Sequence, residues 1–255
     1  IVIVILLSKL AGFIRDIIVA NYYGASLVSD AYFYAYQIPA LAVVILGGMG
    51  GPFHSATVSV FSRIIDNFNV KPKKEVKRLF NTYETFSLLV FGLIALICFL
   101  YPDWVMKIII SQASPELSSL AAYHLRLMSP VILVGALLGL YYGILVTYNK
   151  FLLPNIAPSM VSVGIILTLI ITKGDNTGFY LALGTIIGAL LQLLVQTPVV
   201  IKLGYSFKPV FDFFKNKKFS EILELLMPAF LSSTIGQIGI YVDIFFASSL
   251  AQGQW

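Results

Sequence analysis

Long apolar stretches separated by short polar loops are the feature that most constrains this chain. A helix needs roughly 20 apolar residues to cross a bilayer, and backbone polar groups in lipid must bond within a helix or a closed barrel. Of the 255 residues, 58% are hydrophobic and 11% are charged, against about 25% charged in soluble domains. The sequence predicts an all-α, polytopic membrane helix bundle. Its seven expected spans cover about 1–23, 31–62, 81–101, 122–147, 155–172, 179–201 and 222–250.

The second of these stretches is long for a single crossing. Its centre, residues 47–53, reads GGMGGPF. Glycine and proline weaken or interrupt a helix, and irregular backbone is tolerated inside a membrane protein where other helices cover it. We therefore expect this span to bend or unwind at its centre.

Glycines recur at four-residue spacing in two other spans. Such a stripe of small residues lets the backbones of two helices approach closely. The pattern indicates packing either between helices of one chain or between two copies of it. The residues are Gly135, Gly139 and Gly143 in the fourth span, and Gly184 and Gly188 in the sixth.

The basic residues gather in alternate loops. Most of the 17 Lys and Arg residues lie in segments 63–78 and 202–218 and at Lys150. Loops rich in Lys and Arg face the cytoplasm, so the N-terminus is expected to be cytoplasmic. This distribution accounts for the net charge of +5 without a nucleic-acid partner. Segment 63–78 is either a topology signal alone or also a surface for anionic membrane lipids.

Charged residues inside the first span are the strongest functional signal. Lys9, Arg15 and Asp16 interrupt an apolar run, and Asp30 opens the next one. A charge at bilayer depth costs at least ~2.5–3.5 kcal/mol, which suggests a polar cavity between helices. A cationic surplus there favours an anionic substrate, and the planar fork of arginine suits phosphate.

The partners of these charges remain open. Lys9 and Asp16 are seven residues apart and return to nearly the same helical face, so they could pair while Arg15 faces the cavity. Alternatively, Arg15 pairs with Asp30 of the next span. A third reading is that the charges only neutralise one another or extend to the membrane interface.

The last span carries a stripe of polar side chains. These residues either line the opposite wall of the same cavity or form hydrogen bonds between helices. They are Ser232, Ser233, Thr234, Gln237, Tyr241 and Asp243.

Motifs for catalysis or metal binding are absent from the sequence. There is no phosphate-binding loop, no GxSxG or HExxH element, and no pair of acids at catalytic spacing in the spans. His54 and His124 have no histidine or cysteine at ligand spacing, and Cys98 is the single cysteine. We therefore expect no enzyme activity, no metal and no cofactor.

Two ordered residue patterns resemble a known family. One runs through the first two spans: Ser8, Gly12, Arg15, Asp16, Ala20, Gly24, Ala25, Asp30, Ala31, Ala35 and Pro39. The other is N-x-F-x-x-P-x-x-A-P: Asn149, Phe151, Pro154, Ala157 and Pro158. Both resemble the MurJ/MviN family of the MOP exporter superfamily, whose members are lipid II flippases.

The resemblance implies a MOP/MATE-like fold with two six-helix lobes. Residues 1–203 would form the N-lobe with six transmembrane helices. Residues 204–220 would form a basic cytoplasmic linker between the lobes, and residues 221–255 would begin the C-lobe with its first helix. The chain would then be a fragment of a longer protein.

The resemblance also implies a substrate site. In the family, basic residues of the first helix and an acid of the second line the central cavity, which assigns substrate binding to Lys9, Arg15 and Asp30. Lys9 stands where the family usually has arginine, so bidentate geometry is lost there. Residues 40–53 are uncharged, although many members carry charges after the matching proline. Further candidates to line the cavity are Asp16, Gln37, His54, Gln237 and Asp243.

The function implied is lipid II flipping in the bacterial cytoplasmic (inner) membrane. Undecaprenyl-pyrophosphate-linked muropeptide would move from the inner to the outer leaflet by alternating access, as one step of peptidoglycan biosynthesis. The expected partners are lipid II, membrane lipids and a coupling ion. Three alternatives stay open: a flippase for another lipid-linked glycan, an ion-coupled exporter of the same superfamily, and a non-transporting cell-wall scaffold.

Overall fold

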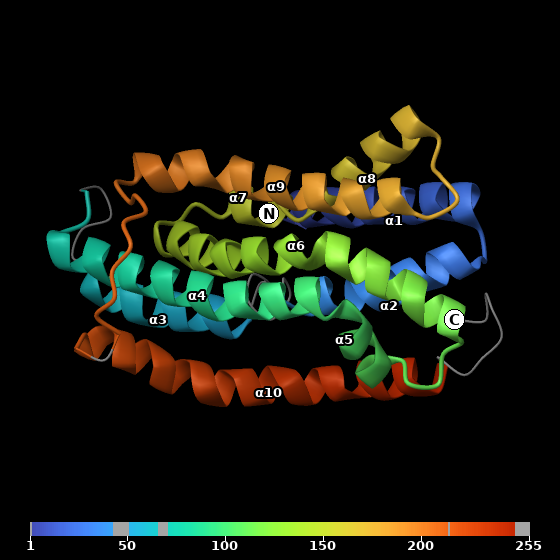
Figure 1. The fold of residues 1–255 in the computed structure, drawn as a ribbon. Helices are drawn as coiled ribbons and strands as arrows, with labels where there is room; N and C mark the ends of the chain where they lie inside the picture. Colours follow the sequence, from blue (N-terminus) through green and yellow to red (C-terminus); the bar gives the residue numbers. More distant parts are fainter. Residues whose placement is uncertain (1, 43–50, 66–70, 214, 248–255) are drawn as a thin grey trace.

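The chain folds into an all-helical bundle, as the sequence predicts (Figure 1). The structure is a computed structural model that describes residues 2–42, 51–65, 71–213 and 215–247. In these ranges the helices are α1 (Val2–Tyr23), α2 (Leu27–Ala42), α3 (Pro52–Ile64), α4 (Lys74–Leu100), α5 (Pro102–Ile109), α6 (Pro115–Thr147), α7 (Leu152–Ile156), α8 (Ser159–Thr172), α9 (Phe179–Lys202) and α10 (Lys217–Ala247).

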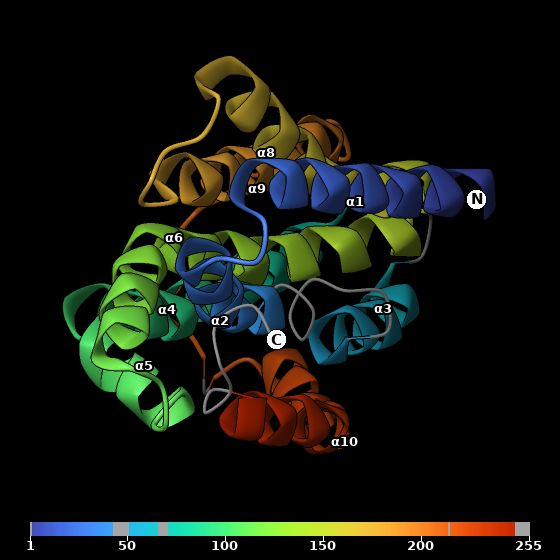
Figure 2. The same ribbon diagram turned by 90° about the vertical axis from the view of Figure 1, so that its right-hand side faces the viewer.

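Helix α6 forms the centre of the bundle. It packs against α2, α3, α4, α5 and α9. In its most apolar stretch of 18 residues, 78% of the residues are buried. Figure 2 shows α6 between a layer of α1, α8 and α9 on one side and α10 on the other. The helix starts at Pro115, where the Ser114 hydroxyl accepts a hydrogen bond from the Leu117 amide at 3.3 Å. It continues through Pro130.

Three helices in the described part of the chain have the length and apolarity of a membrane span, namely α4, α6 and α9. Helix α8 is apolar but shorter, and the charges of α1 interrupt its apolar run. In the predicted second span, Gly51 has an extended backbone and α3 begins after it at Pro52, which agrees with an interruption at this point. The rest of the expected interruption, residues 43–50, lies outside the described residues.

Other helix boundaries differ from the sequence-based expectation. Helix α6 begins seven residues before the expected position 122, because the cap at Ser114 starts it among polar residues. Helix α5 lies in a segment expected to be a loop. Helix α10 begins at Lys217 rather than at 222. A search for long apolar runs does not detect a short amphipathic helix such as α5. It also does not locate a helix start that is set by a polar capping residue.

Glycines bring α8 and α9 into backbone contact. A Cβ atom on Gly164 would lie 2.5 Å from the Gly184 carbonyl oxygen, and one on Gly188 would lie 2.5 Å from the Val161 Cα. Gly143 of α6 is equally tight against Thr57 of α3, where a Cβ would lie 2.5 Å from the threonine Cβ. The prediction of close packing is thus confirmed between helices of one chain.

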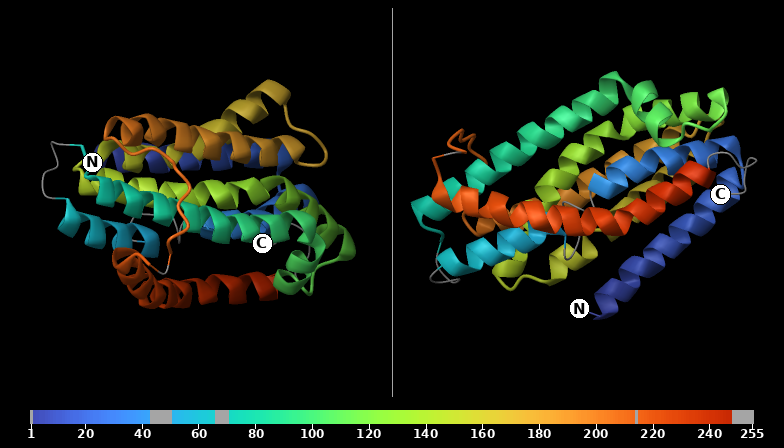
Figure 3. Two further views of the ribbon diagram at one scale, coloured as in Figure 1. Left: turned by 60° about the vertical axis from the view of Figure 1, so that its left-hand side comes forward. Right: turned by 90° about the horizontal axis from the view of Figure 1, so that it is seen from below.

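The basic segments lie at one end of the bundle. Figure 1 shows the end of α3, the start of α4, the end of α9 and the start of α10 together at the left. The turn from α1 to α2 and the connection from α8 to α9 lie at the opposite end (Figure 3). The connections rich in Lys and Arg therefore lie at one end of the bundle, and the connections poor in them lie at the other. This agrees with the alternation of charge between successive loops.

A buried carboxylate links α4 to the central helix. The Glu84 side chain is 1% exposed, and Tyr141 of α6 donates a hydrogen bond to its Oε1 atom at 2.9 Å. Its Oε2 atom finds no hydrogen-bond partner in the described structure. Tyr141 is therefore the group that compensates the burial of this polar side chain.

We expect Tyr141→Phe to destabilise the protein by about 1–3 kcal/mol, because both Glu84 oxygens would then be buried without a donor. Thermal unfolding of the purified protein measures the loss. Tyr142→Phe is the matched control, since the Tyr142 ring packs edge-on against His54 at 4.7 Å and phenylalanine keeps that contact. Equal unfolding midpoints for the two variants would contradict the role given to the Tyr141 hydroxyl.

Candidate functional site

A tight turn between α1 and α2 positions the predicted site. Gly24 ends α1 in the left-handed conformation at φ 57°, which glycine adopts without strain. The Ser29 hydroxyl then donates to the Gly24 carbonyl at 2.8 Å and accepts from the Ser26 amide at 3.1 Å. These bonds fix the first turn of α2 and place Asp30 there, buried in the bundle.

Arg15 and Asp16 form an ion pair on α1. The guanidinium donates through Nε at 2.9 Å and through a terminal nitrogen at 2.7 Å, both to Asp16 Oδ1. The Arg15 side chain is 24% exposed and that of Asp16 is 55% exposed. The pair therefore lies at the boundary between the bundle and its surroundings.

Two of the three arrangements that the sequence left open are not seen in the described residues, and the third, mutual neutralisation of the charges, is compatible with the Arg15–Asp16 pair. Asp16 pairs with its chain neighbour Arg15 rather than with Lys9, and the ion pair of Arg15 is not with Asp30. Residues next to each other on a helix point about 100° apart, but the long arginine side chain can turn back to reach its neighbour. Lys9 is exposed on α1.

Two aromatic side chains of α2 lie within electrostatic range of Arg15. They are Tyr32 and Tyr36. The two rings stack with centroids 5.6 Å apart. The Tyr32 hydroxyl lies 2.8 Å from Thr185 Oγ1 and so joins α2 to α9. The environment of Arg15 is therefore set by rings that the bundle holds in place.

Two of the other predicted cavity residues, Gln37 and His54, lie in the described part of the chain, on α2 and α3. Gln37 is partly buried on α2. His54 lies on α3, with its ring packed edge-on against Tyr142 of α6. Gln237 and Asp243 belong to α10, but their side chains lie outside the described residues. The structure thus pairs Arg15 with Asp16. Asp30 is buried in the first turn of the following helix, α2.

Asp175, which the sequence reasoning did not single out, ties α1 to the start of α9. The Tyr23 hydroxyl donates to Asp175 Oδ1 at 3.2 Å, and the amides of Phe179 and Tyr180 donate to its carboxylate at 3.2 Å each. Partial burial opposes ionisation, but the hydrogen bonds from the Thr177 hydroxyl and from the amides of Tyr180, Phe179 and Thr177 outweigh it and lower the pKa of Asp175. An aspartate shortly before an apolar helix is a capping signal that could have revealed this tie.

No group of histidine, cysteine and acidic side chains in the described ranges could hold a metal ion. Cys98 is buried as a free thiol. The His124 ring lies 2.7 Å from the Thr177 carbonyl oxygen through Nε2, which is a structural contact between α6 and the α8–α9 connection.

Comparison with known proteins gives a consistent assignment. A family model described as Lipid II flippase MurJ matches residues 19–255. A relative from Synechocystis sp., named probable lipid II flippase MurJ, is 33% identical and covers 95% of this chain and 46% of the relative. One of the same name from Aquifex aeolicus is 29% identical, covering 98% of this chain and 48% of the relative.

A solved structure shares the fold. Its description is lipid II flippase MurJ in the inward closed conformation, and it aligns with a TM-score of 0.79 at 26% identity. The alignment covers 98% of this chain and 51% of the other. The chain thus spans about half the length of the proteins that it matches.

The apolar helices packed around the central α6 define a helical, multi-span membrane protein. The evidence for a narrower assignment comes from the family model, which covers nearly the whole chain. The chain belongs to the lipid II flippase MurJ family.

Proposed function

We propose that the full-length protein containing this chain moves lipid II from the inner to the outer leaflet of the bacterial cytoplasmic membrane. Membership of the MurJ family carries this proposal. In it, residues 1–203 form one lobe, residues 204–220 form the cytoplasmic linker, and residues 221–255 begin the second lobe. The N-terminus lies in the cytoplasm, as the basic loops at one end of the bundle suggest.

Arg15 is the residue we assign to the pyrophosphate of the substrate. Its planar fork suits two phosphate oxygens. In the present state, Nε and one terminal nitrogen of the guanidinium donate to Asp16. Substrate phosphate would exchange with the Asp16 carboxylate, so that the cation is never left without a partner. Lys9 adds a second positive charge on the same helix, and Asp30 on α2 orients or balances this charge.

Transport requires no bond to be made or broken. The two lobes would rock so that the cavity faces the cytoplasm and then the outside, as in other transporters built from repeated bundles. A coupling ion or the membrane potential could drive the cycle, since one charge moved across 100 mV is worth about 2.3 kcal/mol.

A flippase for a different lipid-linked glycan is a second candidate. The feature that favours it is the uncharged segment 40–53, where the resemblance to the family leads us to expect charges. A substrate held partly by that segment would meet apolar and small side chains instead. The headgroup that the protein selects would then differ from that of lipid II.

The test is rescue of cells depleted of their own lipid II flippase. We expect the full-length protein to restore growth and the appearance of lipid II in the outer leaflet, and Asp30→Ala to lose this rescue at equal membrane levels. Failure of a well-expressed wild-type protein would favour the other glycan. Rescue of growth by Asp30→Ala without lipid II translocation would instead support a scaffold.

A further inference from the structure

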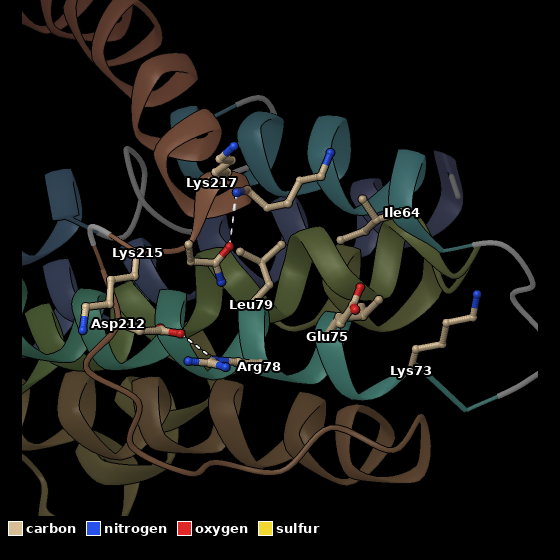
Figure 4. A pocket seen from close by; sticks show the side chains of 11 residues that line it. Ile64, Lys73, Glu75, Arg78, Leu79, Asp212, Lys215 and Lys217 are labelled. Carbon is tan, nitrogen blue, oxygen red and sulfur yellow. Dashed lines mark hydrogen bonds and ion pairs between the residues drawn. The ribbon is translucent and has the colours of Figure 1, made fainter.

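A pocket lies at the basic end of the bundle, away from Arg15. Its volume is about 530 Å³, and its lining comes from the end of α3, the start of α4, the 203–216 connection and the start of α10 (Figure 4). Helix α1, which carries Arg15, packs instead against α2, α7 and α8. The pocket is thus a separate feature from the proposed substrate site.

Positive charge dominates the lining of the pocket. The cationic residues are Lys73, Arg78, Lys215, Lys217 and Lys218, and the acidic ones are Glu75 and Asp212. The Asp212 carboxylate is already engaged: Arg78 Nε donates to Oδ2 and the Thr82 hydroxyl to Oδ1, both at 2.5 Å. Burial opposes ionisation of Asp212, but the hydrogen bonds from Thr82 and Arg78 outweigh it and lower the pKa of this carboxyl group. Asp212 is therefore an anion that serves the fold.

Two lysines of the pocket are available to a ligand. Lys215 and Lys217 are exposed, and neither ammonium group forms an ion pair within the described part of the chain. Lys218 lies 3.7 Å from Glu221, a carboxylate that also pairs with Arg63 of α3 at 2.6 Å. Figure 4 shows Lys217 at the top of the pocket lining, Lys215 at the left and Lys73 at the right, from three different segments. An anion in the pocket would therefore lie in the electrostatic field of several cations.

Two helix N-termini add to this potential. Helix α4 starts at Lys74 beside the pocket, and its N-cap residue, Lys73, makes no side-chain capping bond to the first-turn amides. Helix α10 starts at Lys217. A helix N-terminus carries a partial positive charge and attracts phosphate. The helix ends therefore act in the same direction as the lysines.

We propose that this pocket binds a phosphate-bearing anion. The phosphate belongs either to an acidic phospholipid headgroup at the cytoplasmic face or to a soluble phosphate compound. Lysine binds phosphate as a point charge, and the pocket is larger than one phosphate group requires. Because the lining joins α3 and α4 to the connection and α10, the bound anion would hold the start of α10 against α3 and α4.

The test compares two double variants of the full-length protein in lipid nanodiscs. Lys215→Gln with Lys217→Gln removes the two available cations of the pocket. Lys107→Gln with Lys173→Gln removes the same charge from α5 and the α8–α9 connection, outside the pocket. Retention of phosphatidylglycerol is measured by native mass spectrometry, and binding of inorganic pyrophosphate by the shift in the unfolding midpoint.

We expect the pocket variant to bind one of these probes about tenfold more weakly than wild type, while the control variant binds as wild type does. Loss of phosphatidylglycerol alone identifies a lipid headgroup, and loss of pyrophosphate identifies a soluble phosphate. Lys215→Arg with Lys217→Arg should retain binding, which excludes misfolding as the cause. Equal losses in the pocket and control variants, or no loss in either, would overturn the proposal. None of these readouts depends on lipid II flipping.

Discussion

Arg15→Ala is expected to abolish lipid II translocation by the full-length protein. The substitution removes both donors that now bind Asp16 and that we assign to the substrate pyrophosphate. Loss of two hydrogen bonds from a charged group should slow translocation by at least about a hundredfold. The assay is rescue of flippase-depleted cells, together with the amount of lipid II accessible in the outer leaflet. Arg15→Lys keeps the charge but loses the fork, and should retain partial activity.

A second arginine provides the control for this experiment. Arg126 lies on α6, is exposed, and donates through Nε to the Phe99 carbonyl at 3.2 Å. Arg126→Ala removes the same side chain from another helix and should leave translocation unchanged. Wild-type rescue by Arg15→Ala at normal membrane levels would remove Arg15 from the mechanism. It would leave the lipid II assignment to be decided by the wild-type rescue alone.

Gly188→Ala is expected to destabilise the lobe, although alanine is the better helix former by about 1 kcal/mol. The added Cβ would lie 2.5 Å from the Val161 Cα and 2.8 Å from the Met160 carbonyl oxygen. Both are backbone atoms that cannot rotate away, so α8 and α9 must move apart. Overpacking of this kind costs about 1–3 kcal/mol. A lower unfolding midpoint in detergent and a lower folded yield measure the effect.

Gly12→Ala is the matched control for the steric effect. It places the same methyl group on α1, where nothing lies within 4 Å of the new Cβ. The gain in helix propensity is then present without the clash, so this variant should be as stable as wild type or slightly more stable. If the two alanine variants unfolded at the same temperature, backbone contact between α8 and α9 would not limit the stability of the bundle.

Sequence reasoning located the long helices because each one leaves a direct trace in the chain. The apolar runs predicted α4, α6 and α9. Gly184 and Gly188 predicted the close packing of α9 against another helix, which is α8. The interruption between α2 and α3 followed from the glycine-rich centre of the second stretch. Helices α5 and α7 have 8 and 5 residues and no apolar run of their own, and the sequence analysis missed them.

The residues of the candidate site came from the sequence and stay a prediction, whereas their contacts depend on the fold. The cost of charge in an apolar helix singled out Arg15 and Asp16, but a pairing of Asp16 with Lys9, or of Arg15 with Asp30, is not the ion pair that the described residues show. The tie between Asp212 and Thr82 joins residues 130 positions apart. Nothing local in the sequence signals such a contact, because it depends on how the 203–216 connection lies against α4.

In the proposed two-lobe protein, the same connection would determine where the lobes pivot. Its chain is fixed to α4 by the bond from the Val210 amide to Thr85 at 3.0 Å and by the bonds of Asp212 to Thr82 and Arg78. Helix α10 then begins at Lys217. The first helix of a second lobe would therefore turn about a short hinge beside the start of α4. Rocking on such a hinge reorients the second lobe in place and allows little sideways separation at the cytoplasmic end.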